Sequence, residues 1–230
     1  MMVNKINIFI VTFLFVFLNI IVLADIETDI YTKIKCLCCK KDLKTCVCPH
    51  SEGIKAYIEA LLDVGLNEEG VLIKVAKKYS LGAIINEETK EEIERKLIEE
   101  VGLNRPKIFI QPLSYNLGKV SKNEGKLELK VPVQNKGNEV LKITDLKTTC
   151  ECTTVKLKTK QFESPAFGIK GATSEWEASL APQEKGELII VTDLNHPHVH
   201  LGHMLRVIDI KSNDPVHSLI KVEFEAEIME

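Results

Sequence analysis

The feature that most limits how this chain can fold is a dense group of cysteines near its N-terminal end. Five of the seven cysteines lie between Cys36 and Cys48. A thiol group of this density indicates a disulfide knot, a metal site or a redox centre. Each of these would crosslink a short segment that has too little apolar sequence for a core of its own. The rest of the chain would deliver, support or accompany this segment.

The first 24 residues predict export of the protein. Lys5 precedes a nearly uninterrupted apolar run to Leu23, and the small residue Ala24 comes directly before Asp25. A positive start, an apolar run and a small residue at its end are typical of a secretory signal, here cleaved after Ala24. The run is also about long enough to span a bilayer, so an uncleaved anchor is the alternative. In both cases we expect a periplasmic or extracytoplasmic location.

Export and charge limit the partners that we expect. Exported cysteines tend to be paired unless a reductase keeps them open, and the odd number of cysteines leaves at least one free, metal-bound or intermolecular. The net charge of −3 argues against nucleic acid as a partner. We expect protein partners in the cell envelope, and membrane association only if the N-terminal segment stays uncleaved.

Helical periodicity follows the cysteines. Ser51 is a candidate N-cap for a first helix that Gly65 ends, and the stretch Asn67-Glu68-Glu69 begins a second helix. The stretch Asn86-Glu87-Glu88 caps a third helix, which runs to Val101 and has a mostly charged surface. We therefore expect a small cysteine-rich helical domain over residues 25–85 and a helical spacer over residues 86–105.

From Pro106 onward the pattern changes to alternation of apolar and polar residues, which is typical of half-buried strands. The alternation is clearest at residues 127–133, 176–180 and 220–228, and turn sequences separate the runs. Many strands without an intervening helix predict an antiparallel immunoglobulin-like β-sandwich over residues 106–230. The fold class predicted for the whole chain is α+β.

The segment 35–40, Lys-Cys-Leu-Cys-Cys-Lys, resembles the Arg-Cys-Leu-x-Cys-Gln signature of the CcmH family, which comprises thiol oxidoreductases of cytochrome c maturation. The helices that follow, with the sequence Lys-Tyr-Ser-Leu-Gly at residues 78–82, are similar to the helical hairpin of that family. The resemblance covers about residues 30–85. It implies that Cys36 and Cys39 form a catalytic redox pair.

A second resemblance covers about residues 106–228. The stretches Asn-Lys-Gly at 135–137, Cys-Glu-Cys-Thr at 150–153, Leu-Ala-Pro at 180–182 and Ser-Asn-Asp-Pro at 212–215 resemble bacterial immunoglobulin-like domains related to the Hydin type. That family implies the sandwich fold and no agreed activity.

Three interpretations of the cysteine-rich segment stay open. Cys36 and Cys39 have the spacing of a redox pair, beside Lys35, Lys40 and Lys41, whose charges favour the thiolate. Alternatively, four thiolates close one site for zinc or copper(I), with a further thiol or an imidazole as a spare ligand. The third interpretation is a set of structural disulfides. The candidate metal ligands are Cys36, Cys38, Cys39, Cys46, Cys48 and His50.

Two secondary groups lie in the second half of the chain. Cys150 and Cys152 would share one face at the end of a strand, either as a structural disulfide or in a thiol or metal role. A run of imidazoles follows Asp193, which could orient one of them toward a metal. These candidates are His196, His198, His200 and His203.

These features predict an exported thiol-redox or metal-handling protein in the extracytoplasmic maturation of a cytochrome or another metalloprotein. The protein would be an enzyme, a thiol–disulfide oxidoreductase, only if the thiol-redox interpretation holds. The alternative is a non-enzymatic binding or scaffold protein of the cell envelope with structural disulfides. The chain has no glycine-rich phosphate loop, no Gly-x-Ser-x-Gly sequence and no paired-carboxylate signature. Nothing in the sequence therefore favours a nucleotide-binding protein or a hydrolase.

Overall fold

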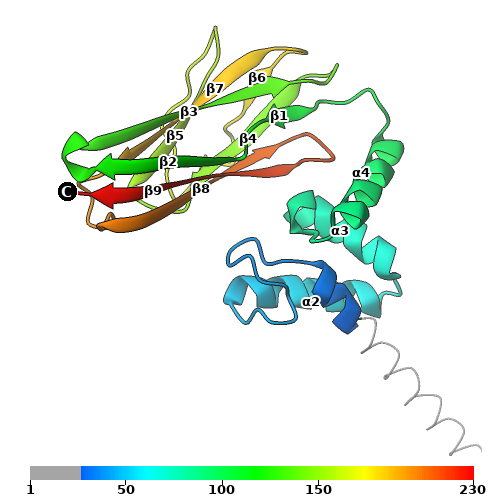
Figure 1. Cartoon of the computed structure of the whole chain (residues 1–230). Coiled ribbons are helices and arrows are strands. Elements are labelled where there is room, and N and C mark those ends of the chain that lie inside the picture. Colours follow the sequence, from blue (N-terminus) through cyan, green and yellow to red (C-terminus); the bar gives the residue numbers. More distant parts are fainter. Residues whose placement is uncertain (1–26) are drawn as a thin grey trace, which may run out of the picture. The chain divides into compact units, whose positions relative to one another are not determined.

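A computed structural model describes residues 27–230, and these residues divide into two compact units, one ending at Lys96 and one beginning at Leu97 (Figure 1). The predicted signal or anchor over residues 1–24 lies outside the described residues. Within residues 27–230, no helix combines the length and the apolar character that crossing a membrane requires.

The first unit is helical. Residues 27–33 form one short helix, and the cysteine-rich segment follows. The elements after that segment are α2 (Pro49–Asp63), α3 (Glu68–Tyr79), the 3₁₀ turn η1 (Leu81–Ala83) and α4 (Glu87–Val101), which crosses the division between the units.

Asparagine caps begin α3 and α4, as the sequence predicts. The side-chain oxygen of Asn67 accepts the backbone N–H of Gly70 at 3.0 Å, and that of Asn86 accepts the backbone N–H of Thr89 at 2.9 Å. These bonds satisfy N–H groups that the first turn of a helix leaves without a partner.

The start of α2 differs from the prediction. The helix begins at Pro49 with Cys48 in the cap position, three residues before the expected cap Ser51. Proline is well suited to the first turn, where its missing N–H removes no helical hydrogen bond. The end agrees with the prediction, since α2 stops at Asp63 and Gly65 follows with a φ of +85°.

The core of the first unit reaches into the cysteine-rich segment. Leu43, in the middle of that segment, is fully buried, and its N–H donates to the carbonyl oxygens of Tyr31 and Ile34. Two isolated bridges, Ile34 with Ile84 and Lys35 with Asp42, hold the start of the segment. Other buried apolar residues of this unit include Ile30, Ile54, Ile58, Val71, Leu72, Val75, Leu81 and Ala83.

The second unit consists of two sheets. One has the order β1-β3-β7-β5 and the other β2-β9-β8-β4-β6 (Figure 1). The strands of the first sheet are β1 (Ile108–Ile110), β3 (Lys126–Asn135), β7 (Lys185–Asp193) and β5 (Thr153–Lys158). Those of the second are β2 (Ser114–Ser121), β9 (Leu219–Met229), β8 (Gly202–Ser212), β4 (Leu141–Thr148) and β6 (Ala178–Leu180), and the 3₁₀ turn η2 (Lys122–Glu124) follows β2.

Residues of both sheets belong to one hydrophobic core. Val131 and Ile190 of the first sheet and Ile208 and Phe224 of the second are among the buried members. The alternation predicted at residues 127–133 and 220–228 is confirmed, because β3 and β9 bury every second residue over most of their length. The prediction of an α+β chain with antiparallel sheets is therefore confirmed at this level.

Two details of the strand prediction are wrong. Among the described strands, β2 pairs with β9 in parallel, because the chain passes from one sheet to the other between β1 and β2 and enters beside β9 in the same direction. Trp176 lies before β6, not within a strand, and its ring packs edge-on against Phe167 at a centroid distance of 4.6 Å.

Candidate functional site

The first candidate site is built on a tight turn that carries Cys36 and Cys39. The N–H of Cys36 donates to the carbonyl oxygen of Lys41, and the N–H of Lys40 donates to that of Cys36, both at 2.8 Å. Lys40 has a φ of +59°, the left-handed conformation in which the chain reverses directly after Cys39. The turn thereby brings the thiols of Cys36 and Cys39 close to each other.

A second turn presents Cys46 and Cys48. The Asp42 carboxylate accepts the N–H and the hydroxyl of Thr45, each at 2.9 Å, and the Asp42 carbonyl oxygen accepts the N–H of Cys46 at 3.0 Å. The Cys46 carbonyl oxygen in turn accepts the ammonium group of Lys55 at 2.8 Å. Cys48 then caps α2, so its thiol lies at the positive end of a helix.

The two turns bring four sulfur atoms together. The Sγ atom of Cys48 lies 3.6 Å from those of Cys36 and Cys39 and 3.7 Å from that of Cys46. The Sγ atoms of Cys39 and Cys46 are 2.8 Å apart. All four sulfur atoms lie within 4.8 Å of one another, and Cys36 and Cys46 are buried. We call these four residues the four-cysteine cluster.

The four thiols ionise unequally. The backbone N–H of Ser51 and the neighbouring thiols lower the pKa of Cys48 to about 6, and the contact with Cys39 lowers the pKa of Cys46. The same contact with Cys46 raises the pKa of Cys39, and burial raises that of Cys36. The thiolate character is therefore largest at the start of α2, not at the pair predicted to be catalytic.

Two of the predicted ligands stay outside the cluster. Cys38 is exposed and is not among the four grouped sulfur atoms. His50 is also exposed, and its ring lies edge-on to that of Tyr79 at a centroid distance of 6.3 Å. The exposed position of Cys38 makes it a natural control for experiments on the other four cysteines.

The geometry of the four-cysteine cluster fits a soft metal ion. A tetrahedral zinc ion with bonds of about 2.3 Å to sulfur holds its ligands about 3.8 Å apart. Three of the sulfur contacts, at 3.6 and 3.7 Å, are close to that spacing. The lysines along the segment, Lys35, Lys40, Lys41, Lys44 and Lys55, would offset the negative charge of four thiolates. The donor set therefore suits zinc or copper(I).

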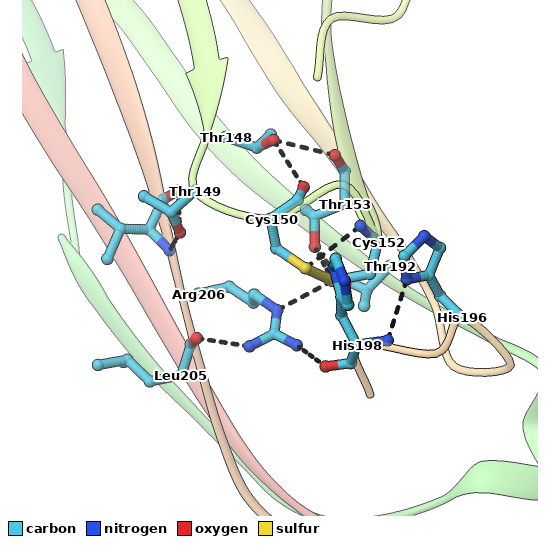
Figure 2. The surroundings of a disulfide bond; sticks show 11 residues. Thr148, Thr149, Cys150, Cys152, Thr153, Thr192, His196, His198, Leu205 and Arg206 are labelled. Carbon is cyan, nitrogen blue, oxygen red and sulfur yellow. Dashed lines mark hydrogen bonds between the residues drawn. A yellow bond between two sulfur atoms is a disulfide. The ribbon is translucent and has the colours of Figure 1, made fainter. Parts of the chain in front are cut away.

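The second candidate site is a disulfide between Cys150 and Cys152 (Figure 2). These residues follow the end of a strand, as the sequence predicts, but they lie in the turn between β4, which ends at Thr148, and β5, which begins at Thr153, and not in extended backbone. The Thr148 hydroxyl donates to the carbonyl oxygens of Cys150 and Thr153, at 3.0 and 3.1 Å. This turn directs both sulfur atoms to one side.

Polar side chains from other elements surround the disulfide. Nε of Arg206, on β8, donates to Sγ of Cys152 at 3.1 Å (Figure 2). The rings of His196 and His198 lie 4.8 Å apart, and their nitrogen atoms group with a carboxylate oxygen of Glu151 within 4.8 Å. The sequence signalled the cysteines and the two histidines, but nothing in it connected Arg206 to them.

The other predicted members lie apart from this group. His203 is exposed, with Nε2 at 4.0 Å from the Glu225 carboxylate, and His200 is exposed as well. The side chain of Asp193 accepts the backbone N–H of Asn195 at 3.0 Å. The structure therefore brings together the first two histidines of the run and leaves the last two outside.

A hollow of about 650 Å³ lies elsewhere on the second unit and contains none of the predicted site residues. Its lining includes Phe109, Pro132 and Gln134 together with three lysines, Lys158, Lys160 and Lys185.

Comparison with known families supports the interpretation of the second unit. A family model described as "Protein of unknown function (DUF1573)" matches residues 108–167. This agrees with the predicted resemblance of this region to bacterial domains without an agreed activity. No curated protein matches the chain. The resemblance of residues 30–85 to the CcmH family stays a prediction.

Solved structures with a similar part come from several kinds of protein. A protein of unknown function from Porphyromonas gingivalis W83 is 15% identical, with a TM-score of 0.40 over 55% of this chain and 49% of that one. The chain thus spans about half the length of that protein. The human CEP192 PapD-like domain 7 is 14% identical, with a TM-score of 0.35 over 55% and 88%. The periplasmic chaperone SfaE is 8% identical, with a TM-score of 0.33 over 54% and 58%.

Proposed function

We propose that the four-cysteine cluster binds one zinc or copper(I) ion and that the protein handles this metal outside the cytosol. The observation that carries the proposal is the grouping of four Sγ atoms within 4.8 Å, from Cys36, Cys39, Cys46 and Cys48. Four thiolates around one point are the donor set of a closed site for a soft metal ion. Such a site also stabilises the fold of a small domain, since binding and folding are coupled.

The closest sulfur contacts favour metal binding over exchange at the predicted redox pair. Cys36 contacts Cys48, and Cys39 contacts Cys46, so these contacts connect the two turns. A redox centre of two cysteines needs none of these cross-contacts. A single metal ion must draw ligands from both turns at once, so it needs the two turns to meet, with Cys39 and Cys46 moved from 2.8 Å to about 3.8 Å apart.

The setting of this activity is also a proposal. The apolar run before Asp25 supports export, and the CcmH-like sequence at residues 35–40 supports a role in the maturation of a cytochrome or another metalloprotein. We propose that the second unit is an immunoglobulin-like sandwich that serves a protein partner in the cell envelope. Under the alternative, a scaffold with structural disulfides, the contact between Cys39 and Cys46 would be the natural place for one of the bonds.

Metal binding can be measured on the full chain after reduction and removal of metal. Titration with zinc, and separately with copper(I), against a chelator that changes colour should give about one equivalent per chain. Cys36→Ser and Cys46→Ser should each abolish tight binding, because each removes one of four ligands. Cys38→Ser is the matched control and should bind like the parent protein, since its thiol lies outside the cluster.

Two results would refute the metal proposal. One is full binding by Cys46→Ser, which would show that Cys46 is not a ligand. The other is an equal loss in Cys38→Ser and Cys46→Ser, which would indicate unspecific thiol binding. The redox alternative has its own test, exchange with a model disulfide by the double variant Cys46→Ser, Cys48→Ser. If this variant exchanges at the parent rate although it no longer binds metal, the result would favour a redox pair of Cys36 and Cys39.

A further inference from the structure

The disulfide between Cys150 and Cys152 is poorly suited to stabilise the fold. A disulfide stabilises mainly by restricting the unfolded chain, and this contribution is smallest for the shortest loops. Here a single residue, Glu151, separates the two cysteines. Two hydrogen bonds hold the turn without the sulfur atoms, because the Thr148 hydroxyl and the N–H of Thr153 both donate to the Cys150 carbonyl oxygen, at 3.0 and 3.1 Å. A third, from the N–H of Cys152 to Sγ of Cys150 at 3.2 Å, does involve a sulfur atom.

The two sulfur atoms are in unequal environments. Cys152 is 3% exposed, whereas Cys150 is about half-buried. An external thiolate can therefore reach Cys150, while Cys152 is shielded. In disulfide exchange, the attacked sulfur stays bound to the incoming group and the other sulfur leaves as a thiolate. The exposure therefore selects Cys150 for attack and Cys152 as the leaving group.

The surroundings of Cys152 suit a negative charge. Nε of Arg206 donates to Sγ of Cys152 at 3.1 Å, and the two terminal nitrogen atoms donate to the carbonyl oxygens of Leu205 and His198, at 2.8 and 3.2 Å (Figure 2). Within residues 27–230, no carboxylate forms an ion pair with this guanidinium. Two carbonyl groups thus fix the orientation of the guanidinium. Its positive charge is therefore available to pair with a thiolate at Cys152.

A neutral sulfur is a weak hydrogen-bond acceptor, whereas a thiolate beside an arginine forms a charge-assisted bond. The contact with Arg206 therefore becomes much stronger once Cys152 carries a charge. A cation beside a cysteine also favours the thiolate over the thiol. The guanidinium thus stabilises the reduced form of this pair more than the oxidised form that the structure contains.

We propose that Cys150 and Cys152 form a reversible redox centre, in which Cys150 is attacked by a dithiol reductant and Cys152 leaves as a thiolate bound to Arg206. One thiolate of the reductant attacks Sγ of Cys150, the bond between the two cysteines breaks, and its electron pair goes to Sγ of Cys152. The second thiolate of the reductant then attacks the reductant's first sulfur, which is bonded to Sγ of Cys150 in the mixed disulfide. This releases Cys150, which takes up a proton. Two electrons pass to the cysteines, and the reductant becomes a disulfide.

The redox state of this pair can be followed in the full chain despite the other cysteines. Trypsin cleaves after Lys147 and Lys156, and the peptide 148–156 contains Cys150 and Cys152 alone among the seven cysteines. The protein is equilibrated in mixtures of reduced and oxidised dithiothreitol, quenched with acid and alkylated. Mass spectrometry of the peptide then gives the reduced fraction at each mixture, while circular dichroism reports whether the protein is folded.

The deciding comparison is between the parent chain and Arg206→Gln. Loss of the charge-assisted bond should lower the equilibrium constant for reduction of the peptide about tenfold. Lys119→Gln, which removes an exposed positive charge from β2, is the matched control and should leave the constant unchanged. An equal constant in Arg206→Gln and the parent would overturn the proposal. A peptide that stays oxidised at every mixture in which the parent is folded would overturn it too.

A second pair of variants keeps the proposal testable if Arg206→Gln fails to fold. Cys152→Ser leaves the half-buried Cys150 as a free thiol, and Cys150→Ser leaves the shielded Cys152. Each folded variant is reacted with oxidised glutathione, and the mixed disulfide is then measured in peptide 148–156. Cys152→Ser should form it at least about tenfold faster than Cys150→Ser. Equal rates, or faster reaction of Cys150→Ser, would contradict the assigned roles.

Discussion

At the scale of single residues, Ser51 links the start of α2 to the four-cysteine cluster. Its buried hydroxyl lies 3.1 Å from the carbonyl oxygen of Cys46 and 2.7 Å from that of Cys48, and its backbone N–H contributes to the lowered pKa of the Cys48 thiol. The residue that the sequence suggests as a helix cap thus holds the segment between the two cysteines of the second turn.

Ser51→Ala should destabilise the first unit by about 1–2 kcal/mol, because buried carbonyl groups lose a hydrogen-bond donor. Urea unfolding of the full chain, followed by the helical circular dichroism signal, measures this change. Ser114→Ala, the same substitution at an exposed position, serves as the control and should have little effect. An unchanged midpoint in Ser51→Ala would show that the hydroxyl does not hold the segment.

At the scale of elements, the buried Asp214 joins the start of β1 to the turn between β8 and β9. Its carboxylate accepts Arg105 at 2.8 Å, the backbone N–H of Ile108 at 3.1 Å and that of Val216 at 3.0 Å. Burial alone would raise the pKa of Asp214, but the nearby imidazole of His217, with Nδ1 3.7 Å from the carboxylate, and the hydrogen bond from the N–H of Val216 outweigh it and lower the pKa. Asp214 is therefore ionised in the folded protein.

This ionisation predicts how the stability of the second unit depends on pH. Because the folded-state pKa of Asp214 lies below the unfolded value of about 3.9, its contribution is complete above that value and is lost as the pH falls through the folded-state pKa. Asp214→Asn should cost about 3–5 kcal/mol at pH 7, since it leaves Arg105 buried without its partner. Urea unfolding between pH 7 and pH 3 should show a shallower acid slope in the variant. An equal slope would show that Asp214 is not the group involved.

The helix starts at Asn67 and Asn86 and the alternating strands could be predicted from sequence, because they depend on neighbouring residues. The place of Cys48 as the cap of α2 could not be predicted, because Ser51 has the more typical capping side chain. The helix begins earlier because Pro49 occupies its first position. Arg206 escaped prediction for another reason. It is 54 positions away from Cys152 in sequence, and long-range strand pairing leaves no local pattern.

The grouping of the four cysteines was one of three interpretations that the spacing left open. A spacing rule cannot distinguish them, because a redox pair, a metal site and a disulfide knot all use closely spaced cysteines. The structure adds the cross-contacts between the two turns, such as Cys36 with Cys48. It also adds the separation of Cys38 from the other four.

At the scale of the whole molecule, each unit has its own core and its own group of cysteines. A fragment of residues 103–230 includes every residue of the Asp214 network and should fold alone, with a strand-type circular dichroism spectrum and a cooperative melt. A fragment that begins at Ile108 lacks Arg105 and should melt at a lower temperature. Failure of the longer fragment to fold would show that the second unit depends on the first.

The measurement that tests the account most directly is X-ray absorption at the metal edge of the full chain, loaded with one equivalent of zinc. Binding by the four-cysteine cluster predicts a shell of four sulfur atoms at about 2.3 Å. The spectrum of Cys38→Ser should be identical, and Cys46→Ser should lose at least one sulfur from the shell. A shell dominated by nitrogen or oxygen, or an unchanged spectrum in Cys46→Ser, would contradict the proposed site.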